Sequence, residues 1–328
     1  MLDTEIFLIY VRIYVCVWIG GIVQQPDCCH RDIRKKMTSL ETETPHVPYH
    51  PSWWRQFRVL LRRCGWSNKR NPRVLQARLG QTIVSSLLLG FIYLRLPPDV
   101  PVSRNGAANL ININQGMTGI VSVLQTFTVD KAVALREYQG GAYSLIPYFL
   151  AKTTADFSFH VINPVLFTTI VWFMMGLNDN VLRWLWALAF VFVQTNVCFS
   201  IGYLISSLSP SLDVALASMP LVTMPLVLVS GFLIILDTLP RIWVWLPYLS
   251  PFRWTWSGLM HAMWQGVQLE ECPPQLQPPA CYSSGDDVLK YYSIDKDRMW
   301  LNFIILCIHF FVYRLLGLAA LVFLSGRR

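Results

Sequence analysis

Residues 182–208 have the sequence LRWLWALAFVFVQTNVCFSIGYLISSL, in which Arg183 is the only charged residue. An α-helix needs about 20 mainly apolar residues to cross the hydrocarbon core of a bilayer. This stretch has the required length and composition, and no proline interrupts it. It therefore predicts a transmembrane α-helix, and it sets the fold class expected for the rest of the chain.

Three more apolar stretches precede this one and two follow it. We expect Pro147 and Pro164 to kink the third predicted span, and the fifth contains Pro220 and Pro225. The second span is the most polar of the set. By length and breakers the sequence predicts an all-α membrane protein with six transmembrane helices, at residues 74–94, 106–129, 144–175, 182–208, 213–236 and 300–324.

The composition supports a membrane protein and argues against a soluble one. Of the 328 residues, 54% are hydrophobic and 14% are charged, whereas soluble domains carry about 25% charged residues. The net charge of +8 could suggest a nucleic-acid partner. However, eight basic residues fall between positions 55 and 78, around the start of the first span, which is typical of a cytoplasmic flank that touches anionic lipid headgroups. We expect no nucleic-acid partner, since these residues are Arg55, Arg58, Arg62, Arg63, Lys69, Arg70, Arg73 and Arg78.

The sequence divides into three predicted parts. Residues 1–52 form an N-terminal extension with a polar linker, and the marginal apolar segment 6–23 is either a signal anchor or an unrelated extension. Residues 53–73 are predicted to form an amphipathic helix along the cytoplasmic interface, because residues 53–63 alternate apolar and basic residues at roughly helical spacing. Residues 74–328 form the six-span domain, and both of its ends are cytoplasmic because six is even and basic residues flank both ends.

On this topology residues 237–299 form an outer loop. Its Trp-rich, Pro-interrupted first half predicts short re-entrant helices, which are allowed only where protein shields their backbone. An exported loop is oxidising, so we expect a disulfide between Cys272 and Cys281. The segment Cys28-Cys29-His30 could in principle hold a metal with His46 and His50, but no paired-cysteine zinc motif is present, and we expect no metal site.

The second predicted span carries two polar stripes at helical spacing. Lipid would penalise these groups, so both stripes are expected to face protein, water or substrate, or to hold helices together. One stripe comprises Asn105, Asn109, Asn112, Gly116 and Gly119, and the other comprises Asn114, Thr118 and Gln125.

Three further features could matter for function. The prolines of the fifth span could shape a gate or only a packing kink. Arg314 lies inside the last span, where we expect it to pair with a carboxylate. The charged residues 129–138 predict a short cytoplasmic loop. The chain has no P-loop, no G-x-S-x-G and no H-E-x-x-H motif, so we expect no catalytic activity from it alone.

Motifs spread over residues 50–328 give the chain a family resemblance. Ser52 to Arg58, Arg78 to Ile83, Arg136-Glu137-Tyr138, Tyr148 to Lys152 with Asp156, Ser230 to Leu233, Asp237 to Pro240 and Tyr248 to Arg253 resemble the White-type branch of the ABC transporter G subfamily. The resemblance implies an ABC-2 type membrane domain of a half-transporter, which works as a homo- or heterodimer with another G-subfamily member around a central cavity.

The resemblance also implies roles for individual residues. It implies a coupling helix that receives motion from an ATP-binding cassette, a translocation pathway, and a hydrophobic plug between cavity and exit. The coupling helix would contain Lys131, Arg136, Glu137 and Tyr138; the pathway Asn112, Gln115, Thr118, Met224 and Val227; and the plug Phe232 and Leu233.

The chain departs from the family in two respects. Some multidrug members have a Phe where Thr118 aligns, which argues against flat polyaromatic drugs; the branch carries pigment precursors, sterols or other lipids. The cassette expected before residue 53 is absent from the sequence, and ATP and Mg²⁺ would bind at that missing cassette. The alternative functions are a non-transporting partner of a full half-transporter and an intramembrane enzyme. In either case we expect the protein in the plasma membrane or in a vesicle membrane.

Overall fold

The computed structural model describes residues 52–70, 72–96, 101–178, 180–234, 239–269, 282, 284–295 and 298–325. The described residues are helical, and they contain no strand beyond an isolated bridge between Gln268 and Ser284. The all-α prediction is therefore confirmed. The apolar segment 6–23, the Cys28–His50 candidate ligands and the disulfide pair Cys272 and Cys281 lie outside the described residues.

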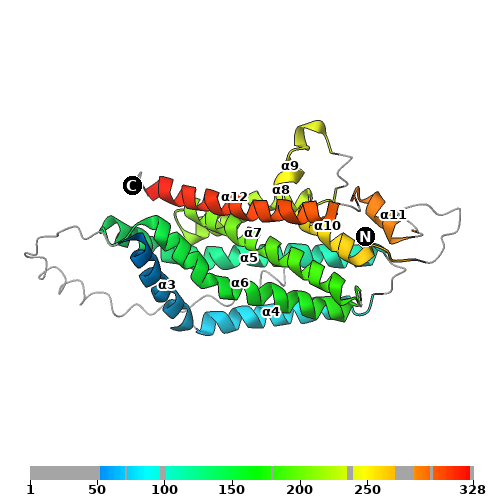
Figure 1. Ribbon diagram of the computed structural model, residues 1–328, viewed down its shortest axis with the longest axis horizontal. Helices are drawn as coiled ribbons and strands as arrows, with labels where there is room; N and C mark the ends of the chain where they lie inside the picture. The colour runs from blue at the N-terminus through cyan, green and yellow to red at the C-terminus, as the bar shows by residue number, and fades with distance from the viewer. Residues whose placement is uncertain are drawn as a thin grey trace, which may run out of the picture. The chain divides into compact units, whose positions relative to one another are not determined.

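Long helices run along a common direction, and a helix at a steep angle leads into them (Figure 1). The steep helix is α3 (Trp53–Arg70), and α4 (Pro72–Ile92) follows at once. Proline suits the first position of a helix because that position needs no amide donor. One side of α3 packs through Leu60 and Phe57 into a core cluster, while Trp54 is 68% exposed. This amphipathic character fits a helix that lies at a membrane interface.

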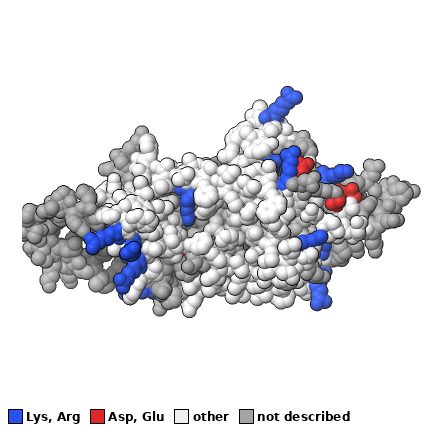
Figure 2. Space-filling view, viewed as in Figure 1, with Lys and Arg blue, Asp and Glu red and all other residues white. Residues whose placement is uncertain are grey.

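Four described helices are long and apolar enough to cross a membrane, by length and composition alone. Besides α4, these are α6 (Leu145–Met175), α7 (Val181–Leu208) and α12 (Met299–Ser325). The remaining two predicted spans correspond to the more polar α5 (Pro101–Gln139) and to the shorter α8 (Leu212–Leu228). The count of six crossings stays a prediction. Figure 2 shows most charged side chains toward the two ends of this face and a largely uncharged stretch between them, as a membrane protein requires.

Helix α7 is the centre of the bundle and packs against α5, α6, α10 and α12. Its N-terminus is capped by Asn180, whose side chain accepts a hydrogen bond from Leu182 N. A Cβ added to Gly202 would lie 2.9 Å from the backbone oxygen of Ile120 on α5. The two helices therefore approach more closely at this point than any larger residue would allow.

Two boundaries differ from the sequence prediction. The charged residues 129–138 are not a loop, because α5 continues through them to Gln139. The fifth apolar stretch was expected to be helical to residue 236, but α8 ends at Leu228 and Gly231 follows with a φ of +96°. That left-handed conformation is available to glycine and ends the helix.

Short helices follow α8 in the segment predicted as the outer loop. They are η2 (Arg241–Trp243), α9 (Leu246–Leu249), α10 (Pro251–Trp264) and α11 (Gly285–Tyr291). Helix α10 is buried along almost its whole length against α5, α7 and α12. Protein therefore shields its backbone, as a re-entrant helix would need, and the re-entrant path itself stays a prediction.

Candidate functional site

The C-terminal end of α5 is joined to α3 by a two-pronged ion pair. The Arg63 guanidinium donates from Nη1 to Glu137 Oε2 and from Nη2 to Oε1, each at 2.6 Å. The Tyr143 hydroxyl donates to the same Oε2 at 2.7 Å. The hydrogen bond from Arg63 is the main cause that lowers the pKa of Glu137. The geometry therefore holds Glu137 as a carboxylate that ties three segments together.

A second contact reinforces this junction. Gln56 on α3 accepts a hydrogen bond from the Ser144 backbone amide at 3.0 Å, at the N-cap of α6. The turn between α5 and α6 contains Gly141, whose φ is +74°. Helix α3 thus contacts both the end of α5 and the start of α6.

Lys131 is buried and faces the end of a neighbouring helix. Its Nζ donates to the backbone oxygens of Ser206 and Ser209, each at 2.6 Å, and only 6% of the residue is exposed. The last carbonyls of a helix have no intrahelical partners and carry partial negative charge. Lys131 therefore stabilises the C-terminus of α7 and fixes it to α5.

The four residues of the expected coupling helix thus have different environments. Lys131 is buried against α7 and Glu137 is paired with Arg63, whereas Arg136 and Tyr138 are exposed. Two of the four hold the helix in place, and the other two remain on the surface, where a partner can reach them.

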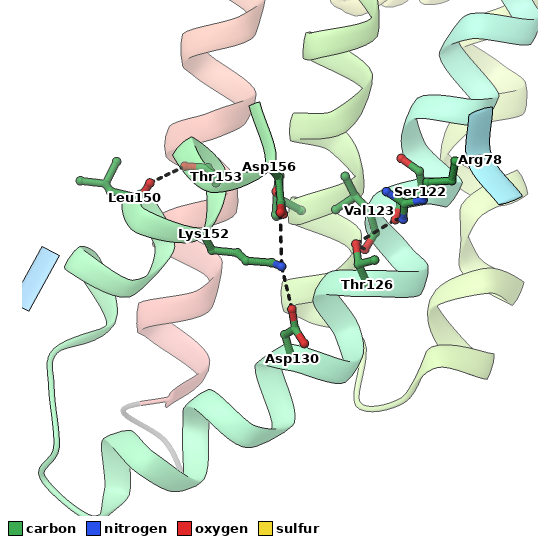
Figure 3. Close-up of polar contacts among 10 residues, drawn as sticks. Arg78, Ser122, Val123, Thr126, Asp130, Leu150, Lys152, Thr153 and Asp156 are labelled. Carbon is green, nitrogen blue, oxygen red and sulfur yellow. Dashed lines mark hydrogen bonds and ion pairs between the residues drawn. The ribbon is translucent and has the colours of Figure 1, made fainter. Parts of the chain in front are cut away.

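Lys152, buried on α6, bridges α6 to α5 (Figure 3). Lys152 Nζ lies 2.8 Å from Asp130 Oδ2 and 3.4 Å from Asp156 Oδ1. The Tyr203 hydroxyl donates to Asp156 Oδ2 at 3.2 Å. This cluster was not among the predicted site residues. A lysine and an aspartate four residues apart in an apolar helix could have indicated it, because charged groups inside a membrane span need partners.

The expected ion pair of Arg314 is not formed among the described residues, although the Asp156 carboxylate attracts its charge from a greater distance. Its guanidinium carbon lies 4.8 Å from the ring centre of Tyr203, 5.5 Å from that of Phe310 and 5.9 Å from that of Phe149. Among the described residues it has no carboxylate within ion-pair distance. Aromatic faces therefore surround the guanidinium at short range, and Asp156 acts on it only from beyond ion-pair distance.

The structure distinguishes the two polar stripes of α5. Asn105, Asn112 and Gly116 are buried against α10: Trp264 Nε1 donates to Asn105 Oδ1 at 2.7 Å, and Asn112 Nδ2 donates to the Phe252 carbonyl at 2.9 Å. Gln194 on α7 donates to the Asn112 carbonyl at 2.9 Å. The first stripe therefore holds helices together. The second stripe, Asn114, Thr118 and Gln125, is only half-buried.

The expected pathway residues do not share one environment in the single chain. Asn112, Gln115 and Val227 are buried, Thr118 is half-buried, and 53% of Met224 is exposed. Only the last two are open to a molecule outside this bundle. Helices α5 and α8 pack against each other.

The expected plug residues follow the end of α8. The Phe232 ring is half-buried, with its centre 5.2 Å from that of Trp256 on α10. Leu233 is 54% exposed. The pair is therefore anchored on one side by α10 and free on the other.

The chain is similar to known proteins over most of its length. Residues 55–264 match the family described as "ABC-2 type transporter". The chain is 31% identical over 306 residues to "Protein white" of Drosophila melanogaster, covering 91% of this chain and 44% of that protein. It is 28% identical over 298 residues to "ABC transporter ATP-binding protein/permease wht-1" of Caenorhabditis elegans, covering 88% and 44%. The chain thus spans less than half the length of these relatives.

Proposed function

The chain belongs to the ABC-2 type transporter family, as a multi-pass membrane domain of the White-type G subfamily, and we propose that it forms the path through which an ATP-driven dimer moves a small molecule. The observation that carries the proposal is the junction of α3, α5 and α6 around Glu137 and Arg63. A transport path needs a place where an external motor can push on it. This junction links the surface residues Arg136 and Tyr138 to three helices at once.

The route itself would lie between two copies of the domain. The half-buried stripe of Asn114, Thr118 and Gln125 and the exposed Met224 lie on neighbouring helices. Leu221, also on α8, is 79% exposed. A second G-subfamily chain facing this surface, the same or another, would enclose a cavity with polar and apolar walls. Phe232 and Leu233 would close its outer end.

Such a cavity suits an amphipathic molecule, because its walls offer amide and hydroxyl groups beside large apolar side chains. We propose a sterol or other lipid, or a pigment precursor derived from tryptophan or guanine. Thr118, in place of an aromatic residue, provides no ring for a flat drug to stack on. ATP and Mg²⁺ would be bound by a cassette that this sequence does not contain, and the membrane would be the plasma membrane or that of a vesicle.

The experiment is ATP-dependent transport by the complete protein that carries this chain, in proteoliposomes with its G-subfamily partner. Labelled sterol, tryptophan-derived and guanine-derived compounds would be offered separately. Accumulation of one class that requires ATP and is lost in Thr118→Phe supports the path. If the partner transports equally well without this chain, or less well with it, the chain is an interaction partner and the proposal fails.

A further inference from the structure

Six buried polar atoms belong to α5, α7 and α10, three helices that contact one another, and none has a hydrogen-bond partner among the described residues. Each of the six residues is at most 4% exposed. They are Asn109 Oδ1, Asn112 Oδ1, Gln115 Oε1, Gln194 Oε1, Thr255 Oγ1 and Trp256 Nε1.

Hydrogen bonds between the helices locate two of these residues, and position along the helices locates three more. Asn112 donates to the Phe252 carbonyl, and Gln194 donates to the Asn112 carbonyl. Helices α5 and α10 run antiparallel here, since Trp264 bonds to Asn105 at one end and Phe252 bonds to Asn112 at the other. Asn109 lies between these two contacts on α5, and Thr255 and Trp256 lie between them on α10.

Leaving these atoms without partners would be costly. Buried polar groups in native proteins are almost always hydrogen-bonded, to protein or to ordered water. An orphaned buried group loses its full hydration. Six such atoms on three helices that contact one another therefore indicate a component that satisfies them.

The chemistry of the six atoms defines that component. Four are amide oxygens, which only accept hydrogen bonds; the Trp256 indole only donates, and the Thr255 hydroxyl does both. The molecule that binds them must both donate and accept hydrogen bonds and does not need a charge. It must also be small enough for the buried interior. Water meets all of these conditions. We infer that the interface of α5, α7 and α10 holds a cluster of ordered water molecules bound by these six side chains.

Bridging water would affect how α10 can move against α5, whatever molecule is transported. A direct hydrogen bond between two helices fixes their separation, whereas bridging water re-forms its bonds at a range of separations. The water cluster would let α10 shift against α5 without leaving amides unpaired. Phe232 would move with α10, because its ring lies against Trp256.

The first test is radiolytic hydroxyl labelling of the complete protein in lipid nanodiscs, read by mass spectrometry. Ordered water generates radicals beside the residues it touches. Trp256 is the reporter, and Trp172 is its matched control, since it is fully buried but donates its Nε1 hydrogen to the Asn178 carbonyl. We expect Trp256 to be labelled several-fold faster than Trp172. Equal rates would overturn the inference.

The second test uses an isosteric pair of variants and the melting temperature. Thr255→Val removes a hydroxyl that water would satisfy, so Tm should fall; in a dry interior the same change removes an orphan and Tm should rise. Thr195→Val is the control, since that hydroxyl already bonds to the Val191 carbonyl. An unchanged or higher Tm for Thr255→Val counts against water. A wild-type Tm that drops when choline replaces sodium would overturn it in favour of a bound cation.

Discussion

Arg63 and Glu137 form two parallel hydrogen bonds although 74 positions separate them in the chain. Arg63 belongs to the amphipathic helix α3 and Glu137 to the last turn of α5. Because both groups are partly exposed, the pair adds less than about 1 kcal/mol to stability. Its importance lies in orientation: a forked guanidinium on a carboxylate fixes the relative angle of two helices.

We first predict that Glu137→Ala uncouples transport without preventing substrate binding. The change removes the acceptor for both Arg63 and Tyr143, so a push on α5 no longer displaces α3. In the complete protein, substrate-stimulated ATP hydrolysis should fall several-fold while substrate affinity is retained. Asp295→Ala is the control, because it breaks the exposed Arg298–Asp295 pair. Stimulation that survives in Glu137→Ala would remove Glu137 from the coupling role.

We also predict a specific pH dependence for this junction. The hydrogen bond from Arg63 lowers the pKa of Glu137. A carboxylate with a lowered pKa in the folded state stabilises the fold above its unfolded pKa, and this contribution is lost as pH falls through the folded pKa. The Tm difference between wild type and Glu137→Gln should be constant from about pH 6 to pH 8 and should shrink below about pH 4.3. A difference that grows on acidification would contradict the assignment.

The spans and the interfacial helix were predictable because long apolar runs and an amphipathic pattern are local properties of the sequence. The continuation of α5 to Gln139 was not. Its charged residues are typical of a loop, but each interacts with another helix. Asp130 pairs with Lys152, Lys131 donates to the end of α7, and Glu137 pairs with Arg63. Sequence spacing contains no information about these pairings.

The candidate site was predictable only in part for the same reason. Helical spacing identified two polar stripes on α5 but could not tell which one faces the bundle. Asn112 turned out to be buried against α10, whereas Thr118 is half-exposed. The surroundings of Arg314 were not predictable either, because a prediction that considers only carboxylates as partners overlooks the rings of Tyr203 and Phe310.

The Lys152 cluster should be essential for stability. Lys152→Met leaves Asp130 and Asp156 without their shared cation, and breaking a buried pair from one side costs about 3–5 kcal/mol. Thermal unfolding in detergent should show a large loss for Lys152→Met and partial recovery in Lys152→Met/Asp156→Asn. Lys290→Met is the control, because Lys290 is exposed on α11. A loss of similar size in both single variants would show that the cluster adds nothing specific.

The close approach of α5 and α7 predicts opposite effects on stability for alanine at two glycines, Gly202 and Gly80. A methyl group at Gly202 would stand 2.9 Å from the Ile120 oxygen, a backbone atom that cannot move alone, whereas one at Gly80 meets nothing within 4 Å. Gly202→Ala should therefore separate the helices and cost about 1–3 kcal/mol. Gly80→Ala, in the interior of α4, should leave stability unchanged or raise it by up to about 1 kcal/mol, because alanine favours helix. Both values follow from thermal unfolding of the two variants under identical conditions. If Gly202→Ala melts at or above the wild-type temperature, the two helices do not meet at this point, and Lys131 would no longer be held at the end of α7 by their packing.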